Sequence, residues 1–301
     1  MGDATLAPRH ALDVASAAAR LRAMVLGAPT GEARGSESAQ VQGTVLDARD
    51  EVVFDRGHLA GAGRLSPEEF EQRRAELPSR GAEVLVVHDD PLAAQAAAAA
   101  LAALGYAHVD WLDAPLGAMP GGHAQLGPAA RMWRPSPFLE QVLGLLPRGR
   151  ALDLAAGSGR ESVHLALHGW DVEAWDHAPE ALARAEALAE RNNRRIATRL
   201  VDLERRELPE PGRGWDVVMV FRFLHRRLFP WIERAVAPGG ALVYETYRRG
   251  QERFGRPKHP RFLLWPGELS SAFPALSVEL HEEPEWPQGP VLSRLLARRP
   301  R

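Results

Sequence analysis

Apolar and polar positions follow two different periods in the first part of the chain. Apolar residues recur at helical spacing over residues 11–24, and we expect a helix there. Ser66 and Glu69 are typical of the N-cap and N3 positions of a further helix. The predicted elements after residue 42 are a strand over 43–47, a helix over 66–76, a strand over 83–88, a helix over 91–104 and a strand over 107–112. This order predicts an α/β unit built on a parallel sheet.

The same alternation starts again at residue 150. The predicted strands cover residues 150–154, 171–175, 196–201, 215–221 and 240–247. The helices expected between them cover residues 160–168, 179–192 and 224–236. Two further apolar runs, 276–280 and 291–297, flank a proline-rich turn and predict an antiparallel hairpin at the edge of the sheet. The second half of the chain is therefore also expected to be an α/β unit.

A stretch rich in glycine and proline, residues 115–128, separates the two units and has the composition of a linker. Residues 27–42 have no periodicity and are expected to form a loop. The predicted parts are an N-terminal helix with a flexible loop (1–42), a first domain (43–120), a linker (121–135) and a second domain (136–301).

Composition and charge restrict the class of protein. The chain has 301 residues, 45% hydrophobic and 25% charged, and its net charge of -2 provides no overall positive field for nucleic acid. No cysteine occurs, which excludes disulfides, thiolate metal sites and cysteine nucleophiles. The longest nearly uncharged apolar run, 91–104, is too short to span a bilayer, and the N-terminus has no secretory signal pattern. We expect a cytoplasmic protein that binds neither membrane nor nucleic acid.

Three segments of the first domain follow a known pattern: Val-Leu-Asp-Ala-Arg at 45–49, Arg-Gly-His-Leu at 56–59, and the strand 84–88 that enters a loop. Through them, residues 43–116 resemble a rhodanese domain. In rhodaneses this loop carries a cysteine at the N-terminus of a helix, whose amides and dipole stabilise a persulfide. The resemblance implies a rhodanese-like α/β fold for the first domain.

The rhodanese-like loop of this chain has no cysteine. The resemblance places the nucleophile near Asp89, and a carboxylate cannot carry sulfane sulfur, so sulfur transfer by this domain is excluded. We interpret Asp89 and Asp90 as caps of the following helix, and His58 as a structural residue. A catalytically inactive domain of this kind is expected to act as a protein-docking or homodimerising module.

The second domain begins with a small-residue turn. Residues 151–160 read Ala-Leu-Asp-Leu-Ala-Ala-Gly-Ser-Gly-Arg, which predicts a strand, a turn and the start of a helix. Gly157 and Gly159 allow tight turning and close approach, and free amides at the helix N-terminus face a ligand. The next strand ends at Asp176, about 20 residues further on, where a carboxylate accepts hydrogen bonds from ribose hydroxyls. The combination predicts a nucleotide cofactor.

More motifs follow in a fixed order. Asp202 and Leu203 follow the third strand, Trp-Asp-Val at 215–217 opens the fourth, and Ala-Pro-Gly-Gly at 237–240 leads into the fifth. Residues 128–301 thereby resemble class I S-adenosylmethionine-dependent methyltransferases. The resemblance implies a Rossmann-like seven-stranded domain that binds S-adenosylmethionine. The implied cofactor-binding residues are Asp153, Ala155, Gly157, Ser158, Gly159, Arg160, Asp176, His177, Asp202, Leu203 and Phe221. One departure is Ala155, which replaces the family's first loop glycine.

Five segments resemble a narrower group, the bacterial small-molecule methyltransferases of the tellurite-resistance type. They are residues 132–139, 223–226, 244–247, 253–257 and 262–269. This resemblance implies a small acceptor that is anionic or a soft nucleophile, such as a thiol or an oxyanion of selenium or tellurium. Because the sulfonium leaving group is already activated, the protein mainly has to align and desolvate the acceptor.

The acceptor is expected at the carboxyl ends of the fourth and fifth strands. There His225, with an unperturbed pKa of about 6.5, is a candidate base or else a helix cap. Arg222 and Tyr247 are the other candidate catalytic residues. The loop 251–264 is rich in arginine and predicts an anionic acceptor, unless it is only a solvated basic loop. The candidate substrate-binding residues are Trp133, Arg134, Arg248, Arg253 and Arg256.

Other polar residues receive structural interpretations. Glu245, at the end of a buried strand, is interpreted as the partner of an arginine. Glu161, His164 and His168 share one helix face at metal-ligand spacing, but this helix must pack on the sheet, so no metal site is expected.

Two alternative functions stay open. The chain could be an RNA or protein methyltransferase in which the first domain recruits the macromolecule, as the arginines within 191–206 suggest. Against this, the fourth strand ends in Phe221, Arg222 and Phe223 instead of an Asn/Asp-Pro-Pro-aromatic turn. The second alternative is a cofactor-binding scaffold without activity.

Overall fold

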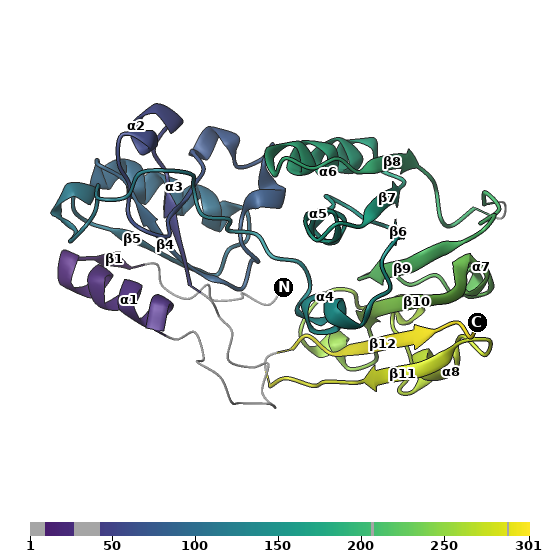
Figure 1. Ribbon diagram of the computed structural model, residues 1–301. Helices are drawn as coiled ribbons and strands as arrows, with labels where there is room; N and C mark the ends of the chain where they lie inside the picture. Colours follow the sequence, from purple (N-terminus) through teal and green to yellow (C-terminus); the bar gives the residue numbers. More distant parts are fainter. Residues whose placement is uncertain (1–9, 27–42, 206–207, 288) are drawn as a thin grey trace. The chain divides into compact units, whose positions relative to one another are not determined.

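The computed structural model describes residues 10–26, 43–205, 208–287 and 289–301. The chain divides into two compact units, Met1–Trp133 and Arg134–Arg301, each with its own sheet (Figure 1). The predicted loop over residues 27–42 lies outside the described residues. In the described ranges, none of the helices has the length and apolar character needed to cross a bilayer.

The first unit contains a five-stranded sheet in which every pair of neighbours is parallel, as predicted from the alternation of strands and helices. Its strands, in spatial order, are β1 (Ala11–Leu12), β5 (His108–Leu112), β4 (Glu83–Val87), β2 (Thr44–Asp47) and β3 (Gly63–Arg64). The short strand β1 was expected to be part of the first helix. Instead its backbone pairs with β5, and Asp13 accepts a hydrogen bond from the Ser16 amide at 2.7 Å as the helix begins.

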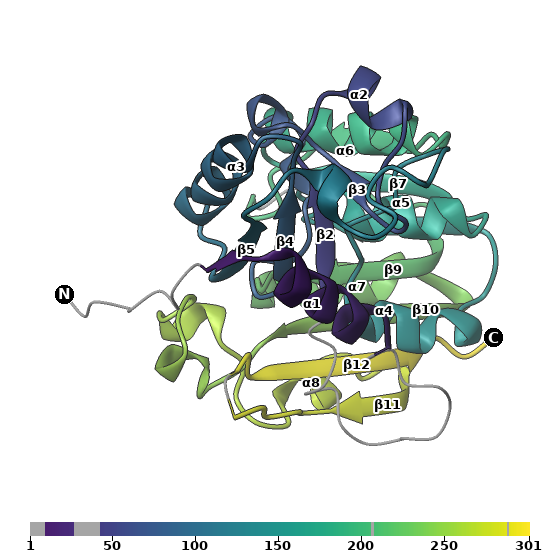
Figure 2. The same cartoon turned by 90° about the vertical axis from the view of Figure 1, so that its left-hand side faces the viewer.

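Helices cover both faces of this first sheet. Along β4, Val84 and Val86 pack on the side of α3 (Pro91–Ala103), whereas Leu85 and Val87 face the opposite side. That opposite side is covered by α1 (Val14–Leu26) and α2 (Glu51–Asp55), and Figure 2 shows α1 in front of the strands. The side chains of β4 are therefore apolar on both faces.

The prediction of one continuous helix over residues 66–76 is wrong. The structure has two 3-10 turns, Pro67–Glu69 and Arg74–Glu76. The predicted capping box is present, because Ser66 donates from its amide and its hydroxyl to Glu69 Oε2 at 3.0 and 3.1 Å. Both Phe70 and Ala75 are buried, and a continuous α-helix would place them about 140° apart around its axis. The chain bends so that both side chains reach the core.

The second unit contains a seven-stranded sheet. The strands, in spatial order, are β11 (Ser277–Glu282), β12 (Leu292–Arg298), β10 (Val236–Tyr247), β9 (Trp215–Phe221), β6 (Arg150–Leu154), β7 (Asp171–Asp176) and β8 (Ala197–Leu200). Strands β10 to β8 are parallel, and β12 is antiparallel to both β10 and β11. The predicted antiparallel hairpin at the edge of the sheet is confirmed.

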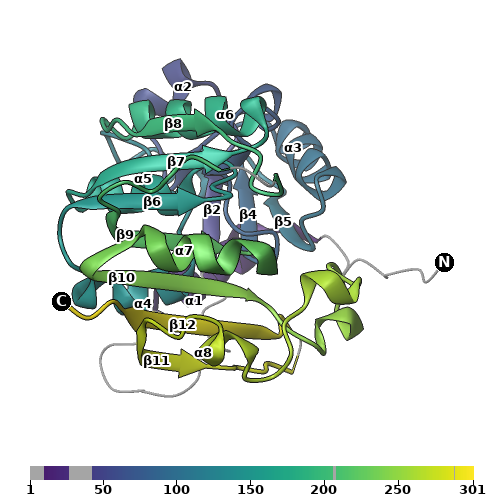
Figure 3. The same ribbon diagram turned by 90° about the vertical axis from the view of Figure 1, so that its right-hand side faces the viewer.

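Helices also lie on both faces of the second sheet. Helices α4 (Pro137–Val142) and α5 (Arg160–Leu167) pack on one face. Helices α7 (Phe229–Ala235) and α8 (Glu268–Ser271) lie on the other face (Figure 3). Helix α6 (Pro179–Arg191) contacts α5 and β7.

The helix predicted over 224–236 is shorter in the structure. A 3-10 turn, Arg226–Leu228, comes before α7, and α7 begins at Phe229 with Pro230 in its first turn. A continuous helix would have placed Pro230 in its interior, where the ring clashes with the preceding turn and a hydrogen bond is lost. The proline therefore sets the start of α7.

The crossing from β8 to β9 differs from the other parallel crossovers, because its described residues contain no helix. Three tryptophans, Trp175, Trp215 and Trp231, fill the space on this face of the sheet. Their ring centroids lie 5.4 to 6.2 Å apart. Burial of these large rings compensates for the apolar surface that a crossover helix would cover.

The segment predicted as a linker, residues 121–135, mostly packs on the first unit. The backbones of His58 and Gln125 exchange two hydrogen bonds of 3.0 Å, and the Ala130 amide donates to the Ala62 carbonyl at 2.9 Å. Met132 belongs to the core on the α3 side of the first sheet. The division between the units falls after Trp133.

Candidate cofactor and acceptor site

The turn between β6 and α5 has an unusual backbone. Ala155, Gly157 and Gly159 have φ angles of 59°, 54° and 76°, all in the left-handed region. A Cβ on Gly159 would lie 2.5 Å from Cβ of Ala185 in α6, so only glycine permits this close packing. By contrast, no atom lies within 4 Å of the Cβ position at Gly157, so the main chain there is open to a ligand.

Asp176 joins the end of β7 to this turn. Its Oδ2 accepts a hydrogen bond from the Gly157 amide at 2.8 Å, and its Oδ1 accepts one from the Ala178 amide at 2.9 Å. The exposed ring of His177 lies with Nδ1 3.4 Å from Asp176 Oδ1. Each carboxylate oxygen keeps a lone pair for another donor. A direct hydrogen bond thus joins Gly157 and Asp176, the two residues whose combination in the sequence predicted a nucleotide cofactor.

Asp153 lies beneath the turn in β6 and is almost completely buried. The Ser162 hydroxyl donates a hydrogen bond of 2.6 Å to its Oδ2. Burial, reinforced by the nearby carboxylates of Glu161 and Asp176, raises the pKa of Asp153 to about 8. This carboxyl group is therefore protonated at neutral pH in the protein without a ligand.

Glu161, in the first turn of α5, is a second carboxyl group of this region. The Ser136 amide donates to its Oε1 at 3.1 Å. Burial raises the pKa of Glu161, although the neighbouring Arg160 opposes the shift. From the sequence, Glu161 was weighed only as a metal ligand and no metal site was expected. Its position immediately after the glycine turn was the signal that could have indicated its place at the site.

Arg222 follows β9 directly and has a φ of 57°. Its amide donates to the Glu245 carbonyl at 2.8 Å, its Nη2 lies 3.1 Å from Glu245 Oε1, and its guanidinium lies 4.9 Å from the ring centroid of Tyr247. Two candidate catalytic residues, Arg222 and Tyr247, are therefore neighbours at the carboxyl ends of β9 and β10.

Glu245 is fully buried in β10 and joins several elements. Its Oε2 lies 2.7 Å from Nε of Arg294 in β12, and the Ser136 hydroxyl donates to its Oε1 at 2.9 Å. The interpretation of Glu245 as the partner of an arginine is confirmed, with both Arg222 and Arg294 as partners.

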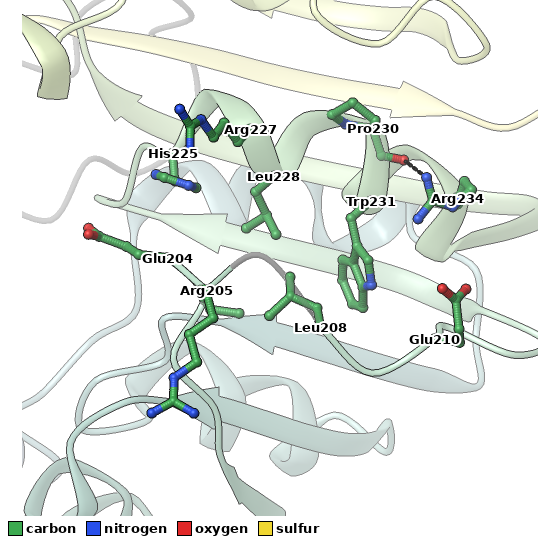
Figure 4. A pocket seen from close by; sticks show the side chains of 11 residues that line it. Glu204, Arg205, Leu208, Glu210, His225, Arg227, Leu228, Pro230, Trp231 and Arg234 are labelled. Carbon is green, nitrogen blue, oxygen red and sulfur yellow. Dashed lines mark hydrogen bonds between the residues drawn. The ribbon is translucent and has the colours of Figure 1, made fainter.

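His225 lines a cavity of about 480 Å³ on the α7 side of the sheet, and Arg222 and Tyr247 do not line it. Leu203 also lines this cavity. Figure 4 shows Leu208 and Trp231 of α7 among the other side chains that line it. His225 also occupies the N-cap position of the Arg226–Leu228 turn, without a hydrogen bond from its side chain as a cap. The structure groups His225 with Leu203 and not with the other candidate catalytic residues.

The remaining predicted residues have varied environments. Asp202 is about half exposed, accepts a hydrogen bond from the Glu204 amide at 3.0 Å and lies near Arg205. Phe221 ends β9 with its ring buried, and Ser158 and Arg160 lie in the turn and at the start of α5. Asp216 accepts a hydrogen bond from the Arg150 amide at 2.7 Å, which ties β9 to β6.

The predicted substrate-binding residues are dispersed. Arg248 forms ion pairs with Glu283 and Glu285, which satisfy its charge within the protein. Arg253 and Arg256 are exposed, and Arg253 donates to the Gly250 carbonyl at 3.1 Å. Trp133 ends the first unit and Arg134 begins the second. In the described ranges, no group of three or more His, Cys, Asp or Glu side chains could hold a metal ion.

The rhodanese-like loop of the first unit is closed by ion pairs. Arg49, which is buried, lies 2.7 Å from Asp47 Oδ2 and 3.0 Å from Asp89 Oδ2. Nε2 of His123 lies 3.2 Å from the other Asp89 oxygen. The interpretation of Asp89 as a helix cap is wrong, because Arg49 and His123 hold its carboxylate. Asp90 is the cap of α3, as predicted, and accepts from the Leu92 amide at 2.9 Å.

His58 lies beside this loop and is buried. Its ring stacks on Phe54 with the centroids 3.8 Å apart, and its Nδ1 lies 3.3 Å from the Phe54 carbonyl oxygen. The structural interpretation of His58 is confirmed.

Comparison with known families gives one match for each unit. Residues 137–240 match the family described as tellurite resistance protein TehB. Residues 33–114 match the family described as rhodanese-like domain. The first unit is therefore similar to rhodanese-like domains and the second to TehB, and the two are called the rhodanese-like domain and the TehB-type domain below. The architecture expected from the two resemblances is thereby confirmed, including the seven-stranded sheet of the TehB-type domain.

Curated relatives match parts of the chain. A probable S-adenosyl-L-methionine-dependent methyltransferase TehB of Haemophilus influenzae is 36% identical over 86 residues, which are 28% of this chain and 29% of that protein. An uncharacterized protein of Mycobacterium tuberculosis is 32% identical over 111 residues, which are 35% of this chain and 40% of that protein. The chain therefore spans well under half of the length of these relatives.

Solved structures are similar to the TehB-type domain at low identity. The crystal structure of TehB from Haemophilus influenzae is 21% identical with a TM-score of 0.46, and the similarity covers 54% of this chain and 61% of that chain. The N-methyltransferase NodS from Bradyrhizobium japonicum, solved in complex with S-adenosyl-L-homocysteine, is 19% identical with a TM-score of 0.44, covering 55% and 84%.

Proposed function

We propose that the TehB-type domain transfers a methyl group from S-adenosylmethionine to a small acceptor. The acceptor is an anion or a soft nucleophile, of the thiol or the selenium or tellurium oxyanion type. The observation that carries this proposal is the hydrogen bond between the Gly157 amide and Asp176, which joins an open glycine turn to a strand-end carboxylate. The match to the TehB family supports it.

The residues present fit the cofactor. The main chain at Gly157 is open, the amides at the start of α5 are directed to a ligand, and the carboxylate of Asp176 can accept from two ribose hydroxyls. Asp202 and Leu203 would contact the adenine, with Phe221, His177 and Arg160 nearby. Asp153, Ala155, Ser158 and Gly159 would surround the methionine part. When bound, S-adenosylmethionine supplies a methyl group on a positively charged sulfonium.

The residues of the chain align and desolvate the acceptor in this proposal. Burial raises the pKa of Asp153 and of Glu161 in the protein without a ligand, and a cationic ligand beside them would favour their ionised, negatively charged forms. Arg222 and Tyr247 approach the acceptor from the ends of β9 and β10. His225 shares a cavity with Leu203, which supports a role on the cofactor side and not as a base. Alignment at contact distance is the main contribution to such a displacement.

We propose that the rhodanese-like domain is a docking or homodimerising module. The resemblance places the sulfur carrier near Asp89, whose carboxylate forms an ion pair with Arg49 and lies 3.2 Å from Nε2 of His123. The chain contains no cysteine that could replace it.

Calorimetry of the full-length protein with S-adenosylhomocysteine tests the cofactor site. Asp176→Ala should weaken binding by about 1.5–3 kcal/mol, because charged hydrogen bonds to the ribose are lost. The matched control is Asp171→Ala at the other end of β7, where the side chain is exposed. Equal affinities of the two variants would contradict the proposed position of the cofactor.

A methyl-transfer assay tests the reaction itself. The protein is incubated with S-adenosylmethionine labelled in its methyl group and with a small thiol, selenite or tellurite. We expect label in at least one small product. Label that enters only added RNA or protein would contradict the proposal of a small acceptor.

A further inference from the structure

Few residues other than glycine have a left-handed backbone in the described ranges. Two of them follow the carboxyl ends of neighbouring strands. The three residues concerned are Ala155, Asn193 and Arg222. Asn193 follows a helix, where asparagine commonly adopts this conformation. Ala155 and Arg222 follow β6 and β9, which pair through Leu154 and Val220. A side chain makes this conformation sterically costly, and such residues concentrate at functional sites.

The surroundings of Arg222 determine its conformation. The amide of Arg222 donates to the Glu245 carbonyl at 2.8 Å, and its Nη2 lies 3.1 Å from the carboxylate of the same residue. Glu245 is itself fixed from two sides by Ser136 and Arg294. A fully buried anchor of this kind holds the guanidinium in one place before any ligand arrives.

The guanidinium of Arg222 is fixed in place, but not all of its N–H donors have a partner among the described residues. The side chain of Arg222 is 36% exposed, whereas that of Glu245 is 0% exposed, so the open side of the ion pair belongs to the arginine. In the described part of the chain, its only partners are Glu245 and the ring of Tyr247. The Tyr247 hydroxyl has no hydrogen-bond partner there either. Several N–H donors and one hydroxyl therefore remain available at one point of the sheet edge.

We propose that Arg222 and Tyr247 form an oxyanion-binding site that selects the methyl acceptor, with Glu245 as the positioning residue of Arg222. This inference rests on the proposed function, because it assigns the acceptor class of the same site. A guanidinium presents two parallel N–H groups, which match two oxygens of a carboxylate or of a selenium or sulfur oxyanion. Arg253, Arg256 and the other exposed basic residues of the 251–264 loop are not needed for this selection.

The test measures oxyanion binding directly. Sodium selenite and sodium thiosulfate are titrated by calorimetry into the full-length protein saturated with S-adenosylhomocysteine. Arg222→Gly, which removes the guanidinium and suits the left-handed backbone, should weaken oxyanion binding about 10- to 150-fold. Its affinity for S-adenosylhomocysteine should not change. Arg222→Lys should also bind the oxyanion more weakly, because the two parallel donors are lost.

The matched control is Arg148→Gly. Arg148 is also an exposed arginine on an aromatic ring, 3.9 Å from the centroid of Trp170, but it lies before β6 at the amino ends of the strands. This variant should bind oxyanion and S-adenosylhomocysteine like the unchanged protein. A loss of oxyanion binding in Arg148→Gly as large as in Arg222→Gly would overturn the proposal.

A double variant tests Glu245 as a positioning residue. If Glu245 acts only through Arg222, Arg222→Gly with Glu245→Gln should bind the oxyanion no more weakly than Arg222→Gly alone. A merely structural role would add a further loss.

The outcomes separate the two proposals. Absence of S-adenosylhomocysteine binding by the unchanged protein would overturn the proposed function. Normal cofactor binding and methyl transfer, together with unchanged oxyanion affinity in Arg222→Gly, would overturn only this inference. Failure of the unchanged protein to bind either oxyanion would do the same.

Discussion

Two acidic residues near the glycine turn of the TehB-type domain have different surroundings. Asp153 is buried in β6, where the Ser162 hydroxyl donates a hydrogen bond to it. Asp176, by contrast, accepts two backbone amides and faces the open turn. Two acidic residues close together therefore differ in their surroundings, since burial raises the pKa of Asp153 whereas Asp176 accepts hydrogen bonds from the turn.

The raised pKa of Asp153 predicts how stability depends on pH. Between its ordinary value of 3.8 and about 8, the unfolded state has lost the proton that the folded state retains. The free energy of unfolding should therefore fall as pH rises through this range. Asp153→Asn does not titrate, and its midpoint of thermal unfolding, measured at pH 5, 6, 7 and 8, should rise relative to that of the unchanged protein. A difference that stays constant with pH would contradict this, and Asp171→Asn is the control.

At the scale of helices and strands, the sequence correctly predicted those bounds that follow from hydrophobic periodicity. Strands β6 and β9 have the predicted bounds, because each is a short and mostly apolar run in the middle of a sheet, interrupted only by charged residues such as Asp153 and Asp216. The prediction of one helix over 66–76 was wrong, because a capping box specifies where a helix starts and not how far it continues. The helix predicted over 224–236 begins later, at Phe229, because Pro230 favours the first turn of a helix, and this position of the proline could have been recognised from the sequence.

The packing of α5 against α6 depends on one glycine. Gly159→Ala would place its Cβ 2.5 Å from that of Ala185 on a backbone with a φ of 76°. We expect the free energy of unfolding, measured with urea, to fall by about 1–3 kcal/mol. Gly144→Ala is the matched control, because no atom lies within 4 Å of its Cβ position and its backbone is not left-handed. Similar stabilities for the two variants would show that α6 moves away at no cost.

At the scale of the whole molecule, each domain has its own hydrophobic core. The clusters around the first sheet contain only residues up to Met132, and those around the second sheet begin at Phe138. The sequence predicted two α/β domains and the glycine turn. It could not show the contact of Gly157 with Asp176 or the support of Arg222 by Glu245, because these join residues far apart in the chain.

Separate cores predict separate responses to mutation. Leu85→Ala, in the core of the first sheet, should lower the stability of the rhodanese-like domain by about 2–5 kcal/mol without changing the affinity for S-adenosylhomocysteine. Leu242→Ala, in the core of the second sheet, should lower the midpoint of the calorimetric transition that this ligand raises. A weaker affinity in Leu85→Ala would contradict the independence of the two cores.

The ion pairs around Asp89 have a consequence for how such a domain persists. A persulfide and a carboxylate both carry negative charge, so an aspartate at this position satisfies Arg49 much as the sulfur species would. The loop therefore keeps a negative charge beside Arg49 without a sulfur carrier. The folded shape of the loop therefore depends on the negative charge and not on the reactive group. A loop of this shape can stay folded without sulfur chemistry for as long as the charge is retained.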